Sequence, residues 1–160
     1  MKSLNLLIND YTDCLQKGEI QAAYKGILEF IGKLRAYYKN KYPDYDMGSV
    51  YQGYMDMSYF SVSTTLLKEK GLKIAIVYLH EKGAFEVWLS ARNRETAKSY
   101  DSKMNRIILD DLSVFHDDSN QDAIIEYTLS STPDFENPAS LINIIEQGVE
   151  KFGAAITSVL

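Results

Sequence analysis

The segment 73–94, KIAIVYLHEKGAFEVWLSARNR, constrains the fold more than any other part of the chain. Its first half, residues 73–81, is nearly continuous in Ile, Ala, Val, Tyr and Leu, which is typical of a strand covered on both faces. Residues 85–92 alternate between apolar and polar, as does a strand whose two faces differ. Because Lys82 and Gly83 form a turn signal between them, the two segments are predicted to pair as an antiparallel hairpin.

The length of the turn decides which residues of this hairpin are paired. A two-residue turn at Lys82 and Gly83 predicts three cross-strand pairs: Leu79 with Glu86, Val77 with Trp88, and Ala75 with Ser90. A three-residue loop with a bulge would shift that register. The sequence is compatible with both loops.

One face of the second strand is polar and is the most informative surface in the sequence. Its side chains recur at every second residue, about 7 Å apart along the strand, and are Glu86, Trp88, Ser90 and Arg92. If the row is open, it forms a polar binding groove. If it is covered, its members need internal partners, and Glu86 and Arg92 are then a structural ion pair or remain solvated.

The row ends at the basic tripeptide Arg92-Asn93-Arg94. Asn93 can cap a helix that runs to about residue 105. Backbone N–H groups at a helix start attract anions, and two arginines strengthen that attraction. A phosphate or carboxylate would therefore bind at Arg92, Asn93 and Arg94, although an ordinary strand-to-helix junction has the same composition.

Upstream of the hairpin, residues 53–62 (GYMDMSYFSV) predict a further strand. Asp56 is unusual in the middle of a strand because Asp is depleted there. If it points inward, it needs a partner and is a candidate site residue; on an exposed edge it gives no indication of function.

Tyr54 is one of seven tyrosines between residues 37 and 59. Such tyrosines line a cleft, stack on a base or sugar, or attach the segment to the sheet.

Two helices are predicted before the sheet. In the first, which Ser3 can cap, apolar residues recur at three- and four-residue spacing from Leu4 to Leu15. Cys14 lies on this apolar stripe and is predicted to be a buried, structural thiol. Gly18 follows as a typical residue just past a helix end.

The second helix is predicted from about Glu19 to Tyr42, where Pro43 follows. Gly26 and Gly32 would weaken an isolated helix. Their presence predicts a close approach of another helix or of the sheet.

Downstream, residues 124–130 predict the last strand, and Pro138 begins a final amphipathic helix. The acidic loop before this strand contains Asp110, Asp111, His116, Asp117, Asp118 and Asp122. Its spacing matches no calcium loop, because the glycine and the terminal glutamate of that motif are missing. With only two histidines in the chain, a zinc site is not expected either. We predict no metal and no cofactor.

The elements follow the order ααβββαβα. This order predicts an α+β fold in a single domain, residues 1–160, with a four-stranded, mostly antiparallel or mixed sheet and helices packed on its faces. A three-layer α/β variant is the alternative.

Composition narrows the functional class. The net charge of −5 does not favour nucleic-acid binding, and no apolar run approaches the ~20 residues of a membrane helix. Cys14 is the one cysteine, so an internal disulfide is excluded and a cytoplasmic location is predicted. Residues 1–106 carry a net charge of +4 and residues 107–160 a net charge of −9. This asymmetry is compatible with a basic face that binds an anion and with ordinary surface charge that has a local bias.

Three segments carry a resemblance to known proteins: YQGYMDMSYF (51–60), LKIAIVYLHE (72–81) and FEVWLSARNR (85–94). With the two leading helices, they resemble a family of short, uncharacterised bacterial proteins over nearly the whole chain. That family is a domain of unknown function, so the resemblance implies no activity.

The order helix, three strands, helix, strand is also similar to the restriction-endonuclease-like nuclease core. That family has an Asp near the start of its second strand and Glu-x-Lys on its third. Glu86 matches the Glu, but Trp88 stands at the Lys position and the second strand begins with Lys73. This likeness implies at most a noncatalytic relative.

Two functions are therefore predicted as alternatives. The first is a noncatalytic binding or interaction domain for a small anionic ligand or a protein, as a monomer or an oligomer, with its site among Tyr54, Asp56, Glu86, Trp88, Arg92, Asn93 and Arg94. The second is a divergent or inactive nuclease or hydrolase relative. It requires the carboxylates of Asp56 and Glu86 to share a metal ion at about 2.0–2.6 Å, which is excluded if they lie on opposite faces of the sheet.

Overall fold

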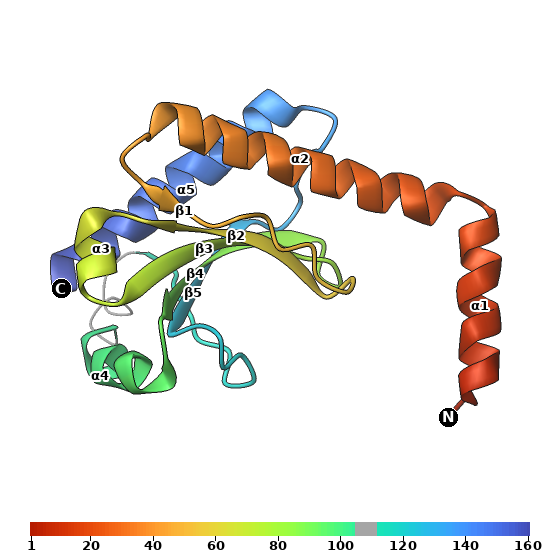
Figure 1. The fold of residues 1–160 in the computed structure, drawn as a ribbon, viewed down its shortest axis with the longest axis horizontal. Coiled ribbons are helices and arrows are strands. Elements are labelled where there is room, and N and C mark those ends of the chain that lie inside the picture. Colours follow the sequence, from red (N-terminus) through yellow and green to blue (C-terminus); the bar gives the residue numbers. More distant parts are fainter. Residues whose placement is uncertain (105–111) are drawn as a thin grey trace.

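The computed structural model describes residues 1–104 and 112–160, which form a sheet with helices arranged around it. Figure 1 shows α2 (Glu19–Lys41) and α5 (Pro138–Val159) on one face of the sheet. Helix α1 (Leu4–Gln16) projects away from the body at the far end of α2. The α+β class is confirmed. Asp110 and Asp111 of the acidic loop lie outside the described residues.

The described residues form a five-stranded sheet instead of the four-stranded sheet that was expected. Its strands follow one another in sequence order, each antiparallel to the next: β1 (Asp46–Met47), β2 (Met57–Ser63), β3 (Leu72–Leu79), β4 (Ala84–Ala91) and β5 (Ile125–Ser130). The extra strand, β1, is two residues long and pairs with the end of β2. Two residues are too few to produce an alternating pattern, so the sequence did not reveal this strand.

The register of the central hairpin differs from that predicted for a two-residue turn. Four residues, 80–83, connect β3 to β4, and the loop closes through a hydrogen bond from Gly83 N–H to the Leu79 carbonyl (2.8 Å). Gly83 has φ +64°, a conformation that glycine adopts without strain. The pairs are Val77 with Glu86, Ala75 with Trp88, and Lys73 with Ser90. Because the shift is by two residues, each side chain keeps its predicted face.

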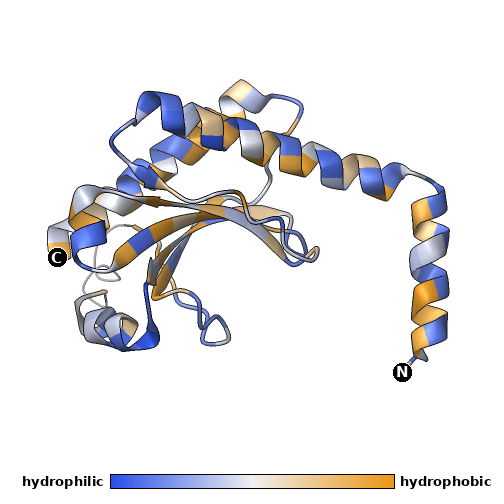
Figure 2. Cartoon of the chain, in the orientation of Figure 1, coloured by the Kyte–Doolittle hydropathy of each residue, from blue (hydrophilic) through white to orange (hydrophobic). Residues whose placement is uncertain are grey.

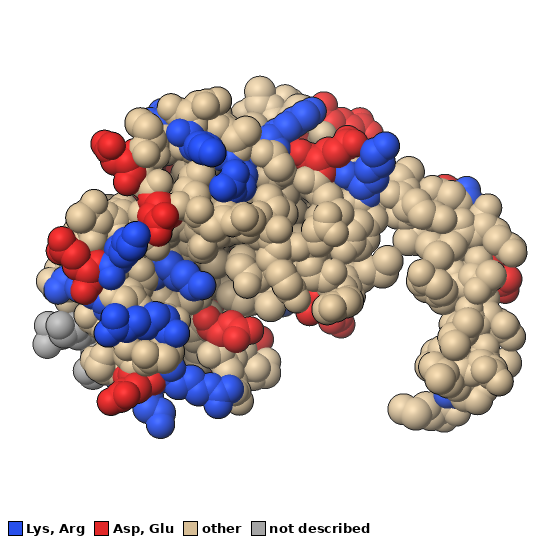
Figure 3. Space-filling model, viewed as in Figure 1, with Lys and Arg blue, Asp and Glu red and all other residues tan. Residues whose placement is uncertain are grey.

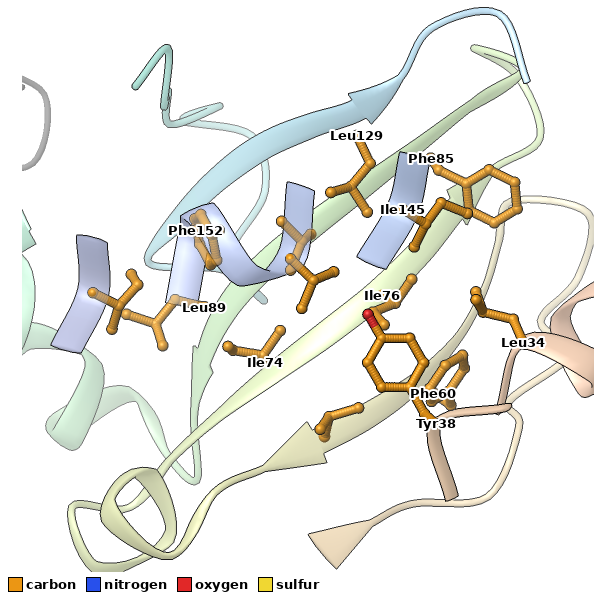
Figure 4. Close-up of a cluster of buried hydrophobic side chains, with 14 of the residues drawn as sticks. Leu34, Tyr38, Phe60, Ile74, Ile76, Phe85, Leu89, Leu129, Ile145 and Phe152 are labelled. Carbon is orange, nitrogen blue, oxygen red and sulfur yellow. The ribbon is translucent and has the colours of Figure 1, made fainter. Parts of the chain in front are cut away.

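The main core lies between the sheet and the two long helices. Figure 4 shows side chains from α2, the strands and α5 meeting there, among them Leu34, Tyr38, Phe60, Ile76, Phe85, Leu89, Ile145 and Phe152. All of these side chains are at least nine-tenths buried. Burial of one apolar side chain of this size stabilises the folded state by about 1.5–3 kcal/mol. The helix face of the sheet is therefore occupied by packing.

The opposite face of the sheet, called the open face below, is covered only in part. A small cluster of Ala75, Val77, Trp88 and Ala123 packs there. Its covering elements are α4 (Arg94–Met104) and the segment 112–124. The single-turn helix α3 (Thr65–Glu69) connects β2 to β3 and is capped by the Thr64 hydroxyl.

Helix α1 has the predicted bounds and the predicted cap, since Ser3 Oγ accepts from Leu6 N–H. The expected burial of its apolar stripe is wrong. Every residue of α1 is exposed except Leu15, which is half-buried, and Cys14 is an exposed thiol instead of a buried one. Figure 2 shows apolar residues along this projecting helix.

The expected close approach at Gly26 and Gly32 is also wrong. Among the described residues nothing lies within 4 Å of a Cβ placed at either position.

No helix in the described ranges is long and apolar enough to cross a membrane.

Candidate functional site

A cavity of about 300 Å³ lies on the open face, between the sheet, α4 and the segment 112–124. Its floor consists of Ala75, Val77 and Trp88, which are buried members of β3 and β4. Around this floor stand polar and apolar side chains from β2, β3, β4, the start of α4 and the segment 112–124: Met57, Tyr59, Lys73, Ser90, Asn93, Arg94, Gln121 and Asp122. The cavity therefore has an apolar base and a mostly polar rim.

The sequence of the hairpin creates this cavity. Alternation along β4 places Trp88 and Ser90 on the open face, as predicted. Ala75 is the cross-strand neighbour of Trp88, and its small side chain leaves space beside the large indole. Ser90 Oγ donates to the Asp122 carbonyl (2.6 Å), and Ile124 N–H donates to the Leu89 carbonyl (2.7 Å). These two bonds attach the segment 112–124 to β4 and close one side of the cavity.

Glu86 fixes the orientation of the indole at the floor. Trp88 Nε1–H donates to Glu86 Oε1 (2.9 Å), and Lys82 Nζ lies 3.1 Å from Glu86 Oε2. Glu86 is only 3% exposed, so these two donors compensate its carboxylate for the loss of water. Glu86 is thus a positioning residue beside the cavity. Of the two alternatives for a covered row, the ion pair with Arg92 is not formed, and Lys82 is the cation at Glu86 instead.

The start of α4 supplies the cationic side of the rim. Asn93 caps this helix as predicted, since its Oδ1 accepts from Thr96 N–H (2.8 Å). Arg94 Nη2 donates to the neutral amide Gln121 Oε1 (2.8 Å). Lys73 is exposed on β3, and no ion pair to it exists among residues 1–104 and 112–160. Within the described rim, Lys73 and Arg94 stand against one carboxylate, Asp122, so the local charge favours an anion.

Glu126 of β5 holds the covering segment in place. Its fully buried carboxylate accepts from Asp117 N–H (3.2 Å) and from Asn120 Nδ2 (3.1 Å), and His116 Nδ1 lies 3.1 Å away. Burial raises the pKa of Glu126, although these donors act in the opposite direction. Sequence reasoning missed Glu126. The available signal was a Glu at a polar-face position of the strand 124–130, after an acidic loop with turn-forming Asp and Asn residues.

Arg92, Tyr54 and Asp56 lie outside the cavity. Arg92 N–H donates to the Gly71 carbonyl (2.9 Å), and its exposed guanidinium lies against Gly71, the residue before β3. Tyr54 is exposed in the turn before β2, at the other end of the sheet. The predicted set of seven residues is therefore divided, and Trp88, Asn93 and Arg94 alone share the cavity.

Asp56 has a local role in the turn before β2. Its Oδ1 accepts from Tyr54 N–H (2.8 Å), and hydrogen bonds from this and the Met57 backbone N–H lower the pKa of Asp56. It lies near His80, whose ring stacks on Tyr24 of α2. Asp56 is thus on the side of α2, whereas Glu86 faces the open side. The metal-bridging pair that the nuclease hypothesis requires is not formed.

Ser58 and His80 form a contact that resembles a nucleophile and base, with Ser58 Oγ 2.8 Å from His80 Nε2. The Ser58 hydroxyl donates to the Gln52 carbonyl, so Nε2 must be the donor toward Ser58. A base needs a free ring nitrogen facing the hydroxyl. Ser58 is also fully buried, and burial lowers the pKa of His80. This pair fastens the loop 51–56 to the sheet and is not arranged for nucleophilic attack.

Among the described residues, no group of three or more His, Cys, Asp or Glu side chains is placed to hold a metal ion.

The protein-family comparison found one model, described as Domain of unknown function (DUF7000), that matches residues 4–160. The chain belongs to this family. Searches of curated proteins and of solved structures found no significant match.

Membership confirms the resemblance to an uncharacterised family over nearly the whole chain. The matched region begins with α1 and ends after α5, so it includes the projecting helix and every wall of the open-face cavity. The family description names no activity.

Proposed function

We propose that this protein is a noncatalytic binding domain that takes a small organic anion in the open-face cavity. The observation that carries the proposal is the combination, in one cavity, of an apolar floor with an oriented indole and a rim that bears Lys73 and Arg94. A volume of about 300 Å³ lies at the lower end of the range of ligand pockets, which is ~300–1,000 Å³. The ligand is therefore of metabolite size.

The two sides of the cavity indicate the chemistry of the ligand. A flat or apolar part fits against Trp88 and its neighbours Ala75 and Val77, because this floor is apolar and buried and its ring is held by Glu86. A carboxylate or phosphate fits between Lys73 and Arg94, whose donors are suited to such groups. Asn93 adds a polar side chain beside them.

The location and source of the protein are part of the proposal. A bacterial cytoplasmic protein agrees with the single cysteine and with the resemblance carried by residues 51–60, 72–81 and 85–94. The net charge of −5 favours a small anion over a nucleic acid as the partner. The hydrolase alternative depended on a metal ion shared by Asp56 and Glu86, and these two carboxylates lie on opposite sides of the sheet.

Trp88 is the only tryptophan of the chain, so its fluorescence reports directly on the cavity. We would titrate the protein with inorganic phosphate, benzoate, indole-3-acetate and nucleoside monophosphates. A compound with both an apolar ring and an anionic group is expected to change the Trp88 emission and to raise the melting temperature. The proposal fails if none of these compounds does either.

Charge-removal variants test the placement of the anion. Arg94→Gln and Lys73→Gln are each expected to weaken binding about 10- to 100-fold, as is typical for loss of a charge-assisted hydrogen bond. The matched control is Arg92→Gln, which makes the same change two residues away but outside the cavity, and which should leave affinity within about twofold. Equal losses in Arg92→Gln and Arg94→Gln would indicate a diffuse charge effect and would contradict the site.

A further inference from the structure

Helix α1 exposes an apolar stripe that the rest of the chain does not cover. The exposed fractions of its large side chains are 71% for Leu4, 50% for Leu7, 48% for Ile8 and 57% for Tyr11. These residues and Leu15 recur at three- and four-residue spacing, so they lie on one side of the helix. A 13-residue helix is marginal by itself in water, and a helix of this kind normally gains stability by burying such a stripe.

Between α1 and the body lies an apolar cleft of about 850 Å³, whose walls belong to three segments. Tyr11 and Leu15 contribute from α1, and Ile20, Tyr24 and Leu28 contribute from α2. The third wall is the loop with Gly53, Tyr54 and Met55. In Figure 3 the projecting α1 curves around a hollow that is lined mostly by uncharged residues.

The loop wall is attached to α2 and β2 by hydrogen bonds, and its apolar side chains point outward. Tyr24 Oη–H donates to the Gln52 carbonyl (3.3 Å), and the Ser58 hydroxyl donates to the same carbonyl. Tyr54 is 89% exposed, and Met55, with φ +64°, keeps a backbone conformation that is uncommon for a residue other than glycine. A fixed loop that presents two large apolar side chains to solvent is typical of a contact surface.

We propose that two copies of this chain form a symmetric dimer in which α1 of each copy lies in the cleft of the other. A single chain cannot fill its own cleft, because its α1 is one of the walls. In a dimer with a twofold axis, the apolar stripe of each copy is buried in the cleft of the other copy, because both partners use the same surface. The stripe is uncharged, and the charged pair at the cleft, Lys25 and Glu29, lies at 4.0 Å. The two surfaces therefore match in polarity.

The available area is that of a stable interface. The large apolar side chains of the stripe and of the cleft rim together expose roughly 800 Å², taking about 200 Å² for a fully exposed side chain of this size. This value is the most that these side chains can bury, and it is comparable with the ~800 Å² that each partner contributes to a standard protein–protein interface. The other face of α1 carries Asp10 and Asp13, whereas helices that lie on membranes are rich in Lys and Arg on that face. A second copy therefore fits better than a lipid surface.

The test is the oligomeric state of the full chain by sedimentation equilibrium at about 5–100 µM, since interfaces of this size range from micromolar affinity to much tighter. The wild-type chain is expected to be a dimer. Leu7→Asp and Tyr11→Asp should each weaken dimerisation at least about 100-fold, because a buried, unpaired carboxylate is strongly unfavourable. The matched control is Leu6→Asp, since Leu6 is 53% exposed on the opposite side of the same helix; it should remain a dimer.

Folding is checked separately, because α1 contributes no side chain to the described core. The three variants should keep the circular dichroism spectrum of a folded body, so a monomeric variant cannot be mistaken for an unfolded one. A wild-type chain that is monomeric at about 100 µM overturns the proposal, even if it binds vesicles or another protein. Dimers that survive in Leu7→Asp, or that are lost equally in Leu6→Asp, overturn it as well.

Discussion

The indole N–H of Trp88 donates a 2.9 Å hydrogen bond to Oε1 of Glu86, two residues earlier on the same face of β4. Both side chains are more than nine-tenths buried. The carboxylate therefore depends on the indole and on Lys82 for the interactions that water would otherwise provide, and the indole depends on the carboxylate for its orientation. Loss of either partner affects the floor of the cavity.

Trp88→Phe is expected to lower the free energy of unfolding by about 1–3 kcal/mol, because it leaves Glu86 buried with one donor fewer. Denaturant unfolding measures this change. In a double-mutant cycle, Glu86→Leu should be less destabilising in the Trp88→Phe background than in the wild type, with a coupling of at least about 0.5 kcal/mol. Additive effects would show that the bond contributes nothing.

Glu126 is expected to make stability fall as pH rises. Burial raises its pKa in the folded protein above the ordinary 4.5, so the folded state holds this proton more tightly than the unfolded state. The stabilisation is complete below about pH 4.5 and is lost as pH rises through the raised value. Glu126→Gln removes this titration. The melting temperature of the variant relative to wild type should therefore increase from pH 4 to pH 8, whereas the exposed control Glu136→Gln should show no such trend. A flat difference for Glu126→Gln would contradict the assignment.

Glu146 on α5 is expected to have the opposite pH dependence. Burial alone would raise its pKa, but this effect is outweighed by Lys41 Nζ (2.8 Å) and by the hydroxyls of Tyr42 (2.6 Å) and Tyr37 (2.8 Å), so the pKa is lowered. Its stabilisation is present above about pH 4.5 and is lost as pH falls through the lowered value. Glu146→Gln should therefore be destabilising at pH 7 and become less so near pH 3, as thermal unfolding at both pH values can show. An equal loss at both would mean that packing, not charge, dominates.

The neighbouring tyrosines 37 and 38 are expected to respond oppositely to removal of their hydroxyls. Tyr38 Oη is buried and has no hydrogen-bond partner among the described residues, so Tyr38→Phe should raise the free energy of unfolding by about 1 kcal/mol. Tyr37→Phe removes the bond to Glu146 and should lower it by about 1 kcal/mol. Denaturant unfolding of the two variants provides a matched comparison. Destabilisation by Tyr38→Phe would indicate a partner for its hydroxyl.

Alanine substitutions at Gly53 and Gly32 are expected to change stability in opposite directions, because the backbone conformations of the two glycines differ. Gly53 has φ +75°, and a Cβ there would lie 2.0 Å from the Met57 carbonyl oxygen, so Gly53→Ala should destabilise the protein by at least about 2 kcal/mol. Gly32 is helical with open space around it, so Gly32→Ala should stabilise the protein by about 0.5–1 kcal/mol. Chemical denaturation of both measures the contrast. If Gly32→Ala is destabilising, another element does approach Gly32 closely, as the sequence predicted.

Local sequence patterns predicted the long helices and the central strands well, because the spacing of nearby apolar residues determines which of them share one face of a helix or strand. The spacing in 4–15 located α1, and the alternation in 85–92 placed Glu86, Trp88 and Ser90 together on one face. The same patterns did not predict what covers a face. The stripe of α1 has the periodicity of a buried helix, yet it projects into solvent with Cys14 exposed. Periodicity reports amphipathicity, which is equally consistent with a core and with an interface.

The candidate site was predicted in part for the same reason. Trp88, Asn93 and Arg94 are close in sequence, and the strand-to-helix junction brings them to one cavity. Lys73 comes from the neighbouring strand, and its pairing with Ser90 depends on the length of the loop 80–83. Glu126 comes from a strand more than thirty residues later. These partners depend on register and chain path, which local spacing does not encode.

By itself, the sequence therefore determined the α+β class, the positions of the long helices and the two unlike faces of β4, because these follow from short-range periodicity. The tertiary structure alone decided that Arg94 and not Arg92 reaches the cavity, that Asp56 and Glu86 lie on opposite faces, and that α1 stands apart from the core. Each of these outcomes depends on contacts between residues distant in the chain, and such contacts are set by loop lengths and packing instead of by the pattern within any one segment.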